Sequence, residues 1–456
     1  MRRIGIIGAG FSGTAMAAEL YRLAENPIEI FLFDKSGYFG TGAAYNTPYA
    51  FHLLNVRSKD MSLFEDDPRH FVNWLKESGN AQTYLEKEQQ VGEQFAPRML
   101  YATYLKDLLN TMLANESGKV KLKLISAEVI DMTLADHSSG QSAKLMLSDH
   151  SEIEVDKVVL AVGNGTPAVF PFPVSKEVKC INNPWDYTAL NQIDRDAPVL
   201  IVGTGLSMID AVLTLNQQKH EAPIYAVSRH GLLPLPHTQT DKPAVSDDAR
   251  LPQSLRDLCK HLRATIEAHA NEGGDWRSVI AALRLKLPAM WAGASLTDKK
   301  RFLRHLMPYW NVHRHRVHHQ INNMLVNLAA KGQLKVLKGR IVSVTKDSAM
   351  VRERHASTLT EIKVTWLINC MGPGMDIGIA HRPLAECIVE RGYAGFDELK
   401  LGFMVTPTCA LQDAKGVPSS VLYSLGPPTK GMFWESTAVP DIRKQSLILA
   451  KALLAS

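Results

Sequence analysis

The chain has 456 residues, of which 45% are hydrophobic and 21% are charged, and its formal net charge is +5. This length exceeds one ordinary hydrophobic core and predicts two or three domains. The small basic excess contains no block of Lys or Arg, which argues against nucleic-acid binding, and no stretch approaches the ~20 apolar residues that span a bilayer.

The chain opens with a strand, a glycine-rich turn, a helix and a second strand. Ile4–Ile7 predicts the first strand, Gly8–Gly13 the turn, and Thr14–Leu23 a helix whose alanines allow close packing on a sheet. A dinucleotide pyrophosphate must reach main-chain N–H groups, and a Cβ at the first two glycines would block it. Asp34 ends the second strand, where its carboxylate suits ribose hydroxyls and repels a 2′-phosphate. This unit therefore favours FAD or NAD.

Between this unit and residue 195 the sequence predicts a long loop and a helix in residues 36–75, and then a second helix and several strands. The last strand is almost wholly apolar, as a buried parallel strand would be, and it ends at Gly163. The expected elements are a helix at Arg98–Ala114 and strands at Val120–Leu134, Ala143–Ser148 and Glu152–Val162.

A second glycine-rich turn has the same layout as the first. It spans Gly203–Met208 after the strand Pro198–Val202, and Arg229 stands at the offset that Asp34 has in the first unit. A guanidinium fork with a permanent charge suits a 2′-phosphate, so the second turn is assigned to NADPH and the first to FAD. Met208 replaces the third glycine and leaves the phosphate turn intact. The alternative for each turn is a fold element that binds no ligand.

The remainder predicts helices and then a second run of strands. Residues 246–330 are expected to be mainly helical, and a last amphipathic helix covers Ile442–Leu454. Like the first run of strands, the second is expected to form a small sheet and to end in glycine, at Gly372. Its strands are predicted at Leu334–Leu337, Ile341–Lys346, Met350–Glu353 and Glu361–Asn369.

These elements predict an α/β fold with two Rossmann-like dinucleotide-binding domains, one inserted in the other. Residues 1–195 and 335–456 are expected to build the FAD-binding domain. Residues 196–335 are expected to build the NADPH-binding domain with a helical insertion. A crevice between the two would let a nicotinamide reach a flavin.

The five cysteines include no C-x-x-C pair and no zinc-ligand spacing, which fits a reduced, cytoplasmic setting. Gly8 interrupts the N-terminal apolar run too early for a signal peptide. Cys370 is expected to serve packing. His315 and His319 are four apart, but no Cys or carboxylate nearby completes a metal site. Their segment is expected to be a solvated basic face, or to contact a substrate or cofactor anion through Arg314 or Arg316.

With these motifs the chain resembles the two-dinucleotide-binding flavoproteins. The matching segments run nearly from end to end, and the resemblance implies FAD and NAD(P) more than a particular reaction. They are Gly8–Gly13, Gly40–Tyr45, His52–Val56, Gly203–Asp210, Ser228–Gly231, Tyr309–Arg316 and Gly426–Arg443.

Asn55–Met61, followed by Phe64 and Pro68, is similar to the Asn-x-x-Ser-Lys-x-Met stretch of class B flavin monooxygenases. In those enzymes the asparagine lies at the flavin edge and helps to hold the oxygenated flavin, a catalytic role that the resemblance gives to Asn55. Some relatives hydroxylate the nitrogen of small amino acids, including L-aspartate. The Phe-x-Gly-x-x-x-His pattern of better-known monooxygenases is absent, which leaves reduction of another acceptor open.

The segment Gly426–Ala438 precedes the last helix. The resemblance implies that this helix N-terminus faces the flavin, where its dipole would stabilise the reduced form. The alternative is a turn capped by Ser436 or Thr437. The expected cofactor-binding residues are Gly8, Gly10, Phe11, Ser12, Gly13, Asp34, Lys35, Asn55, Gly163, Gly203, Gly205, Leu206, Ser207, Ser228, Arg229, Gly372, Gly426 and Thr437.

Three functional hypotheses follow. The favoured one is an FAD- and NADPH-dependent monooxygenase that uses O2 to hydroxylate the nitrogen of a small amino-containing substrate. The second is an NADPH-dependent reductase of a non-oxygen acceptor such as a quinone, iron or a protein. The third is a non-catalytic sensor that binds FAD and responds to its redox state.

Overall fold

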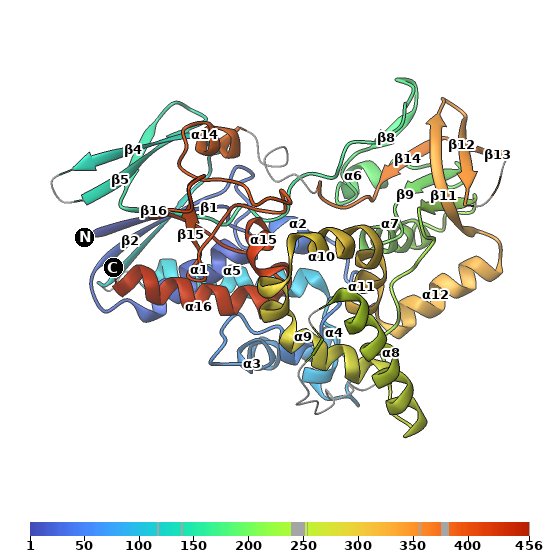
Figure 1. The fold of residues 1–456 in the computed structure, drawn as a ribbon, viewed down its shortest axis with the longest axis horizontal. Helices are drawn as coiled ribbons and strands as arrows, with labels where there is room; N and C mark the ends of the chain where they lie inside the picture. The colour runs from blue at the N-terminus through green and yellow to red at the C-terminus, as the bar shows by residue number, and fades with distance from the viewer. Residues whose placement is uncertain are drawn as a thin grey trace. The chain divides into compact units, whose positions relative to one another are not determined.

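The computed structural model describes residues 1–115, 118–137, 140–238, 251–252, 254–354, 356, 358–374 and 383–455. The chain divides into two compact units. The first comprises Met1–Gly165 and Gly374–Ser456, and the second comprises Thr166–Pro373. Figure 1 labels their helices and strands.

The first unit contains a six-stranded sheet, a separate three-stranded sheet and the helices that cover them. Its helix Arg98–Ala114 has the predicted bounds. The elements in chain order are β1 (Arg2–Ile7), α1 (Phe11–Leu23), β2 (Ile28–Phe33), α2 (Gly42–Tyr45), η1 (Ser58–Asp60), α3 (His70–Glu77), α4 (Asn80–Tyr84), η2 (Val91–Glu93), α5 (Arg98–Ala114), β3 (Val120–Ile125), β4 (Val129–His137), β5 (Gly140–Leu147), β6 (Glu152–Val155), β7 (Lys157–Leu160), α14 (Leu384–Glu390), β15 (Ala410–Gln412), β16 (Pro418–Ser424), η4 (Pro427–Thr429), α15 (Lys430–Phe433) and α16 (Val439–Ala455).

The six-stranded sheet has the order β15-β16-β7-β1-β2-β3, and only β15 is antiparallel to its neighbour. Alternate residues of β2 face opposite sides. Ile30 and Leu32 join a core with α1, α5 and α16, whereas Phe31 and Phe33 join a core with β4–β6. In Figure 1, α1 and α16 lie side by side along one face of this sheet.

The small sheet β4-β5-β6 covers the other face, as predicted for the first run of strands. Gly5 of β1 shows how closely it packs, because a Cβ there would lie 3.1 Å from Leu145 Cδ1 of β5. Both faces of the parallel strands are therefore covered, which explains their apolar sequences.

The second unit contains one seven-stranded sheet and a group of helices. Its elements are β8 (Lys179–Ile181), α6 (Tyr187–Leu190), β9 (Val199–Val202), α7 (Leu206–Gln217), β10 (Ile224–Ser228), α8 (Leu255–Asn271), α9 (Trp276–Gly293), α10 (Leu296–Arg301), the π-helical turn η3 (Phe302–Leu306), α11 (Met307–Arg314), α12 (His319–Ala330), β11 (Leu334–Val344), β12 (Ser348–Glu353), β13 (Leu359–Lys363) and β14 (Trp366–Asn369).

The sheet order β13-β12-β11-β10-β9-β14-β8 accounts for the position of the unit boundaries. The sequence placed them near residues 195 and 335, but the structure places them after Gly165 and Pro373. Strands β8 and β14 pair in parallel beside β9, and β11 pairs in parallel with β10. The second run of strands therefore extends this sheet rather than forming a sheet of its own.

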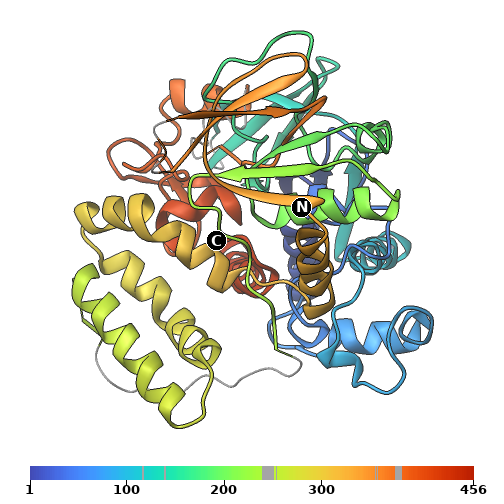
Figure 2. The same cartoon turned by 90° about the vertical axis from the view of Figure 1, so that its right-hand side faces the viewer.

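Helices α8 to α11 fill the region that was expected to be helical, of which residues 246–250 and 253 lie outside the described residues. Figure 2 shows these helices as a separate group at one side of their unit's sheet. In the described part of the chain, no helix is long and apolar enough to cross a membrane.

Candidate dinucleotide-binding sites

The first glycine-rich turn is held tightly against two strand ends of its own sheet. The N–H of Gly8 donates to Phe33 O at 2.9 Å. Gly8 has a φ of +102°, and a Cβ there would lie 2.5 Å from Ala161 O. Only glycine fits this position, because both the backbone angle and the space exclude a side chain.

The second turn repeats this arrangement in the second unit. The N–H of Gly203 donates to Val227 O at 2.9 Å, its φ is +108°, and a Cβ there would lie 2.2 Å from Cys370 O. Two segments far apart in the chain thus share one geometry. The parallel between the turns that the sequence shows is also a parallel in space.

The middle glycines of the two turns, Gly10 and Gly205, are not required by backbone angle or protein packing, unlike Gly8 and Gly203. Gly10 and Gly205 are extended, with φ of −73° and −84°, so their backbone tolerates any residue. A Cβ on Gly205 would meet no protein atom within 4 Å, and one on Gly10 would meet nothing nearer than Gly42 Cα at 3.4 Å. Protein packing does not require glycine at either position. Close approach of a pyrophosphate to the helix N-terminus does, so the residues present fit a dinucleotide.

The third position distinguishes the two turns. A Cβ on Gly13 would lie 1.8 Å from Gly8 O, so α1 approaches its turn as closely as backbone allows. Met208 holds this position in α7 and is fully buried. The second helix therefore does not repeat the close approach.

Asp34 lies directly after β2 and is half-buried beside the first turn. Its carboxylate accepts hydrogen bonds from the N–H of Ala9 at 3.0 Å and the N–H of Ser36 at 2.9 Å. These bonds hold an acceptor at the edge of the turn, where a ribose would lie. The neighbouring Lys35 is exposed, and its Nζ is 3.5 Å from Glu128 Oε1.

Phe11 and Ser12 begin α1. The Phe11 ring is buried 6.0 Å from the ring of Tyr101, so this side chain belongs to the core. Ser12 is also buried, and its Oγ would lie 2.6 Å from a Cβ on Gly426, whose φ is +76°. The C-terminal segment of the chain therefore passes directly over the N-terminus of the first helix.

That C-terminal segment leads into α16. Two N–H groups in the first turn of the helix, those of Asp441 and Ile442, donate to Ala438 O. Thr437 is exposed, and the buried Ser436 Oγ has no hydrogen-bond partner among the described residues. Within the described residues, the Ser436 hydroxyl therefore does not cap the helix.

A half-buried cation lies in the same segment. Lys430 Nζ is 4.6 Å from the centre of the Trp434 ring, and burial lowers the pKa of Lys430. Trp434 has a φ of +57°, a strained angle for a large residue. The sequence drew attention to the glycines of this segment but not to Lys430.

Gly163 and Gly372 occupy equivalent places in the two units. Each lies two residues beyond the carbonyl that faces its glycine-rich turn, each has a positive φ (+69° and +82°), and a Cβ on either would meet no atom within 4 Å. Both predicted glycines therefore lie beside a turn, although in different units.

The end of β10 forms the outer edge of the second turn. Thr204 Oγ1 lies 2.9 Å from Ser228 Oγ and donates to Leu232 O at 2.6 Å, which ties the two segments together. Leu206 and Ser207 begin α7 and are half-buried, whereas Arg229 is exposed. Arg229 is thus accessible at the edge where a ribose would lie.

The loop with Asn55 is fixed on both sides by the segment that precedes α5. The N–H of Leu54 donates to Ala96 O, and the N–H of Ser58 donates to Gln94 O, both at 2.9 Å. Asn55 lies between these anchors and is half-buried. Its backbone is therefore held in a defined place.

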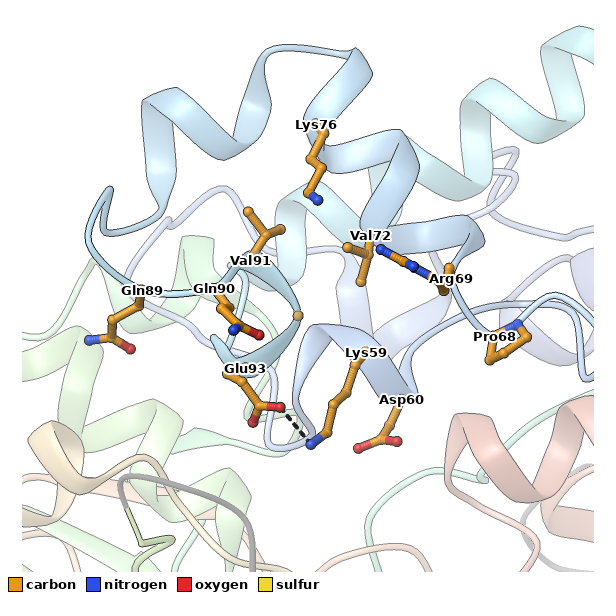
Figure 3. Close-up of a pocket in the computed structure, with 11 residues that line it drawn as sticks. Lys59, Asp60, Pro68, Arg69, Val72, Lys76, Gln89, Gln90, Val91 and Glu93 are labelled. Atoms are coloured by element: carbon orange, nitrogen blue, oxygen red, sulfur yellow. Dashed lines mark hydrogen bonds and ion pairs between the residues drawn. The ribbon is translucent and has the colours of Figure 1, made fainter.

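A groove of about 590 Å³ opens beside this loop, between η1, α3 and η2. Figure 3 shows Lys59 and Asp60 on one side, with Val72 and Lys76 of α3, and Arg69 just before it, across from them. Lys59 Nζ is 2.8 Å from Glu93 Oε1. The other lining residues are Pro68, Gln89, Gln90, Val91 and Gly92. The groove offers charges of both signs.

Arg314 and Arg316 lie in the second unit, at the end of α11 and just after it, and both are half-buried rather than fully solvated. His315 follows α11 and His319 begins α12, so the two are not on one helix face. Across the described ranges, no group of His, Cys, Asp and Glu is arranged to hold a metal ion. Cys370 is buried, and burial raises its pKa, which makes its thiol unreactive.

Comparison with known proteins gives a family match over part of the chain and a likeness of fold over the whole of it. Residues 5–165 match the FAD-NAD(P)-binding family. No curated protein sequence matches the chain. Among solved structures, the chain is similar to an ornithine N-hydroxylase from Kutzneria sp. 744 (13% identity, 99% of this chain and 98% of that one, TM-score 0.67). It is also similar to an L-lysine 6-monooxygenase from Pseudomonas syringae (12%, 99% and 99%, 0.63) and to a bacillithiol disulfide reductase from Staphylococcus aureus (14%, 100% and 99%, 0.56).

Likeness at these identities shows the fold alone, which is the predicted α/β fold with two Rossmann-like domains. The matched residues 5–165 contain the first turn, Asp34 and Asn55.

Proposed function

We propose that the chain is an FAD- and NADPH-dependent monooxygenase that hydroxylates the nitrogen of a small amino-containing substrate such as an amino acid. The observation that carries the proposal is the pair of middle glycines, Gly10 and Gly205. Neither is required by the protein's own packing, and each stands at a helix N-terminus. Two sites for a pyrophosphate on one chain indicate two dinucleotides.

The residues at the ribose edges assign the cofactors. Asp34 presents a carboxylate that the turn itself holds in place, which suits the unsubstituted ribose of FAD. Arg229 presents an exposed guanidinium at the equivalent edge, which suits the 2′-phosphate of NADPH. Ser12, Gly42 and Gly426 gather around the N-terminus of α1 and complete the FAD site.

When bound, FAD supplies the redox chemistry, accepting hydride from NADPH and activating O2. The protein supplies placement and electrostatics. The anchored Asn55 would contact the flavin edge. The N-terminus of α16 and Lys430 would place positive charge near the flavin.

The charged groove between η1, α3 and η2 supports an amino acid as substrate. A zwitterion needs a cation for its carboxylate and an acid for its ammonium group, and the groove offers Lys59 and Arg69 together with Asp60 and Glu93. Arg314 and Arg316 of the second unit are the other proposed anion contacts. Two of the three structural likenesses are to enzymes whose names give an amino acid as substrate, ornithine and lysine.

A reductase is the second candidate, because the chain is also similar in fold to a bacillithiol disulfide reductase and lacks the Phe-x-Gly-x-x-x-His pattern. An FAD-binding sensor is the non-catalytic candidate. One experiment separates all three: NADPH oxidation by the purified flavoprotein with a panel of amino acids and amines, followed by mass detection of products.

A product that is heavier by one oxygen, formed in proportion to NADPH consumed, is the expected result. Rapid reduction of quinones or ferric complexes without substrate stimulation would favour the reductase. A yellow protein that never oxidises NADPH would favour the sensor. A protein that stays colourless in excess FAD would contradict all three proposals.

A further inference from the structure

Two walls of the charged groove, η1 and α3, are joined by one short loop, residues 61–67. The loop leaves the groove after Asp60 at the end of η1 and returns to it at Pro68, just before α3. Both of these residues are labelled in Figure 3. Residues 61–64 of the loop are buried. The position of this loop therefore determines how far apart the two walls stand.

Arg443 of α16 binds this loop at three points. Its Nε donates to Glu65 Oε2 at 2.7 Å, and its Nη1 lies 3.4 Å from Asp60 O and 3.3 Å from Ser62 O. The Arg443 side chain is only 12% exposed. A planar guanidinium can donate in several directions at once, which the single ammonium group of a lysine cannot match. Arg443 therefore fixes the part of the loop that begins in the groove.

Arg22 of α1 binds the other end of the loop. Its Nη1 donates to Asp66 Oδ2 and its Nη2 donates to Glu19 Oε2, both at 2.8 Å. Glu19 is fully buried, and burial raises its pKa. Removal of Arg22 would leave a buried acid without this partner, which is strongly destabilising. Glu65, the acid that pairs with Arg443, is only half-buried, so Arg443 is the better residue to test.

The two helices that hold the loop are also those that approach the first glycine-rich turn. Helix α1 begins directly behind the turn, and α16 packs beside α1 (Figure 1). Gln445, two residues after Arg443, accepts a hydrogen bond from the N–H of Gly426, which lies against Ser12. One turn of α16 thus contacts both the proposed FAD site and the loop that joins the walls of the groove.

We propose that Arg443 is a positioning residue, which holds the two walls of the groove at a fixed separation and ties them to the helix at the proposed FAD site. This inference rests on the proposed function and adds a residue that acts on the substrate through Asp60 and α3. Without Arg443 the loop would be free to shift, and a substrate in the groove would bind more weakly.

Hydrogen exchange of the full-length flavoprotein tests the inference without substrate. Backbone exchange in residues 58–70 would be followed by mass spectrometry in the native protein, Arg443→Gln, Arg443→Lys and Lys444→Gln. Lys444→Gln is the matched control, because Lys444 Nζ is 3.8 Å from the same Glu65 but is exposed and, within the described residues, donates to no carbonyl of the loop.

Exchange should be roughly tenfold faster in Arg443→Gln, as expected for the loss of charge-assisted hydrogen bonds, and native in the control. Arg443→Lys keeps the charge that pairs with Glu65 and so protects folding, but it cannot bind both carbonyls, so its exchange should also rise. Native exchange in both Arg443 variants, or an equal rise in Lys444→Gln, would overturn the inference.

Turnover supplies a readout that a general loss of stability does not move. In Arg443→Lys, KM for the amino acid should rise roughly tenfold, while NADPH reduces the flavin at the native rate. A native KM in this variant would contradict the positioning role. Failure of the proposed function looks different, because the native protein would then hydroxylate no amino acid. The exchange rates would still decide whether Arg443 holds the groove.

Discussion

A Cβ on Gly426 would lie 2.6 Å from Ser12 Oγ, so residues more than four hundred positions apart are packed together without space for one additional carbon. Ser12 begins the helix behind the first glycine-rich turn, and Gly426 follows the strand that pairs with β7. The N–H of Gly426 donates to Gln445 Oε1 of α16 at 3.0 Å. The last helix is thereby tied to the proposed FAD site.

We predict that Gly426→Ala lowers both FAD occupancy and stability. The left-handed backbone and the clash with Ser12 should together cost about 1–3 kcal/mol of unfolding free energy. Gly416→Ala is the matched control, because Gly416 has a similar φ of +82° with no atom near a Cβ. Urea denaturation and flavin absorbance measure the two effects. Ser12→Ala should partly rescue Gly426→Ala, and absence of rescue would contradict the proposed contact.

Sequence patterns predicted most local elements of both units, because such patterns depend on neighbouring residues. The predicted strand Val120–Leu134 was wrong in one respect, since it is two strands, β3 and β4, in different sheets. The small alanines and the glycines around Gly13 indicated a helix packed closely on a strand, and the structure shows the contact with Gly8 O that requires it. Helix α5 has the predicted bounds for the same reason, since a helix is defined by periodicity within one segment.

Features that depend on distant pairing were not predictable. The second run of strands was assigned to the first unit, but β11 pairs with β10 and β14 pairs with β9. Nothing near Lys338 in the sequence shows that it pairs with Ser228. The groove around Lys59 was not predictable either, because it forms only where α3 and η2 pack beside η1. The glycines Gly40 and Gly42 are visible as a pattern in the sequence. The sequence does not show that Gly42 lies against Gly10.

Arg229→Ala should change the choice of nucleotide. Loss of a charge-assisted hydrogen bond costs about 1.5–3 kcal/mol, so the NADPH concentration for half-maximal flavin reduction should rise roughly ten- to a hundredfold. The value for NADH should barely change. Stopped-flow reduction with each nucleotide is the measurement, and Arg256→Ala on the exposed surface of α8 is the control. Equal losses for NADPH and NADH would show that Arg229 does not recognise the 2′-phosphate.

Lys59→Met should weaken substrate binding without affecting the nucleotides. If the groove takes the substrate's carboxylate, KM for the amino acid should rise roughly tenfold, as expected for one charged hydrogen bond. Flavin reduction by NADPH without substrate should be unchanged. Lys87→Met serves as the control, because Lys87 is exposed in the same region but does not line the groove. An unchanged KM in Lys59→Met would place the substrate elsewhere.

The second unit should lose stability in mild acid because of His220. Burial lowers its pKa from an ordinary value of 6.5, and the nearby acids Asp196 and Glu221 only partly oppose this. The folded state therefore binds a proton less readily than the unfolded state. Stability is complete above pH 6.5 and falls as the pH drops from 6.5 towards the lower folded pKa. The loss is about 1.4 kcal/mol for each pH unit that separates the folded pKa from the unfolded one.

His220→Leu tests this contribution, because leucine is uncharged at every pH. Unfolding free energies of the native protein and the variant should be compared between pH 5 and pH 8. The difference between them should shift in favour of the variant below pH 6.5. A difference that stays constant over this range would mean that His220 has the same pKa in both states.

Asn55→Ala should separate flavin reduction from use of oxygen. Its backbone is anchored through Leu54 and Ser58, so alanine changes the side chain without releasing the loop. NADPH should still reduce FAD at the native rate. If the amide contacts the flavin edge, its loss removes about 1.5–3 kcal/mol of stabilisation, and the ratio of hydroxylated product to hydrogen peroxide should fall roughly tenfold or more. Product mass and peroxide are measured together for each mole of NADPH.

Asn73→Ala, on the exposed side of α3, should retain the native ratio. A native product yield from Asn55→Ala would refute the role given to this residue, and slower flavin reduction would instead assign Asn55 to cofactor placement.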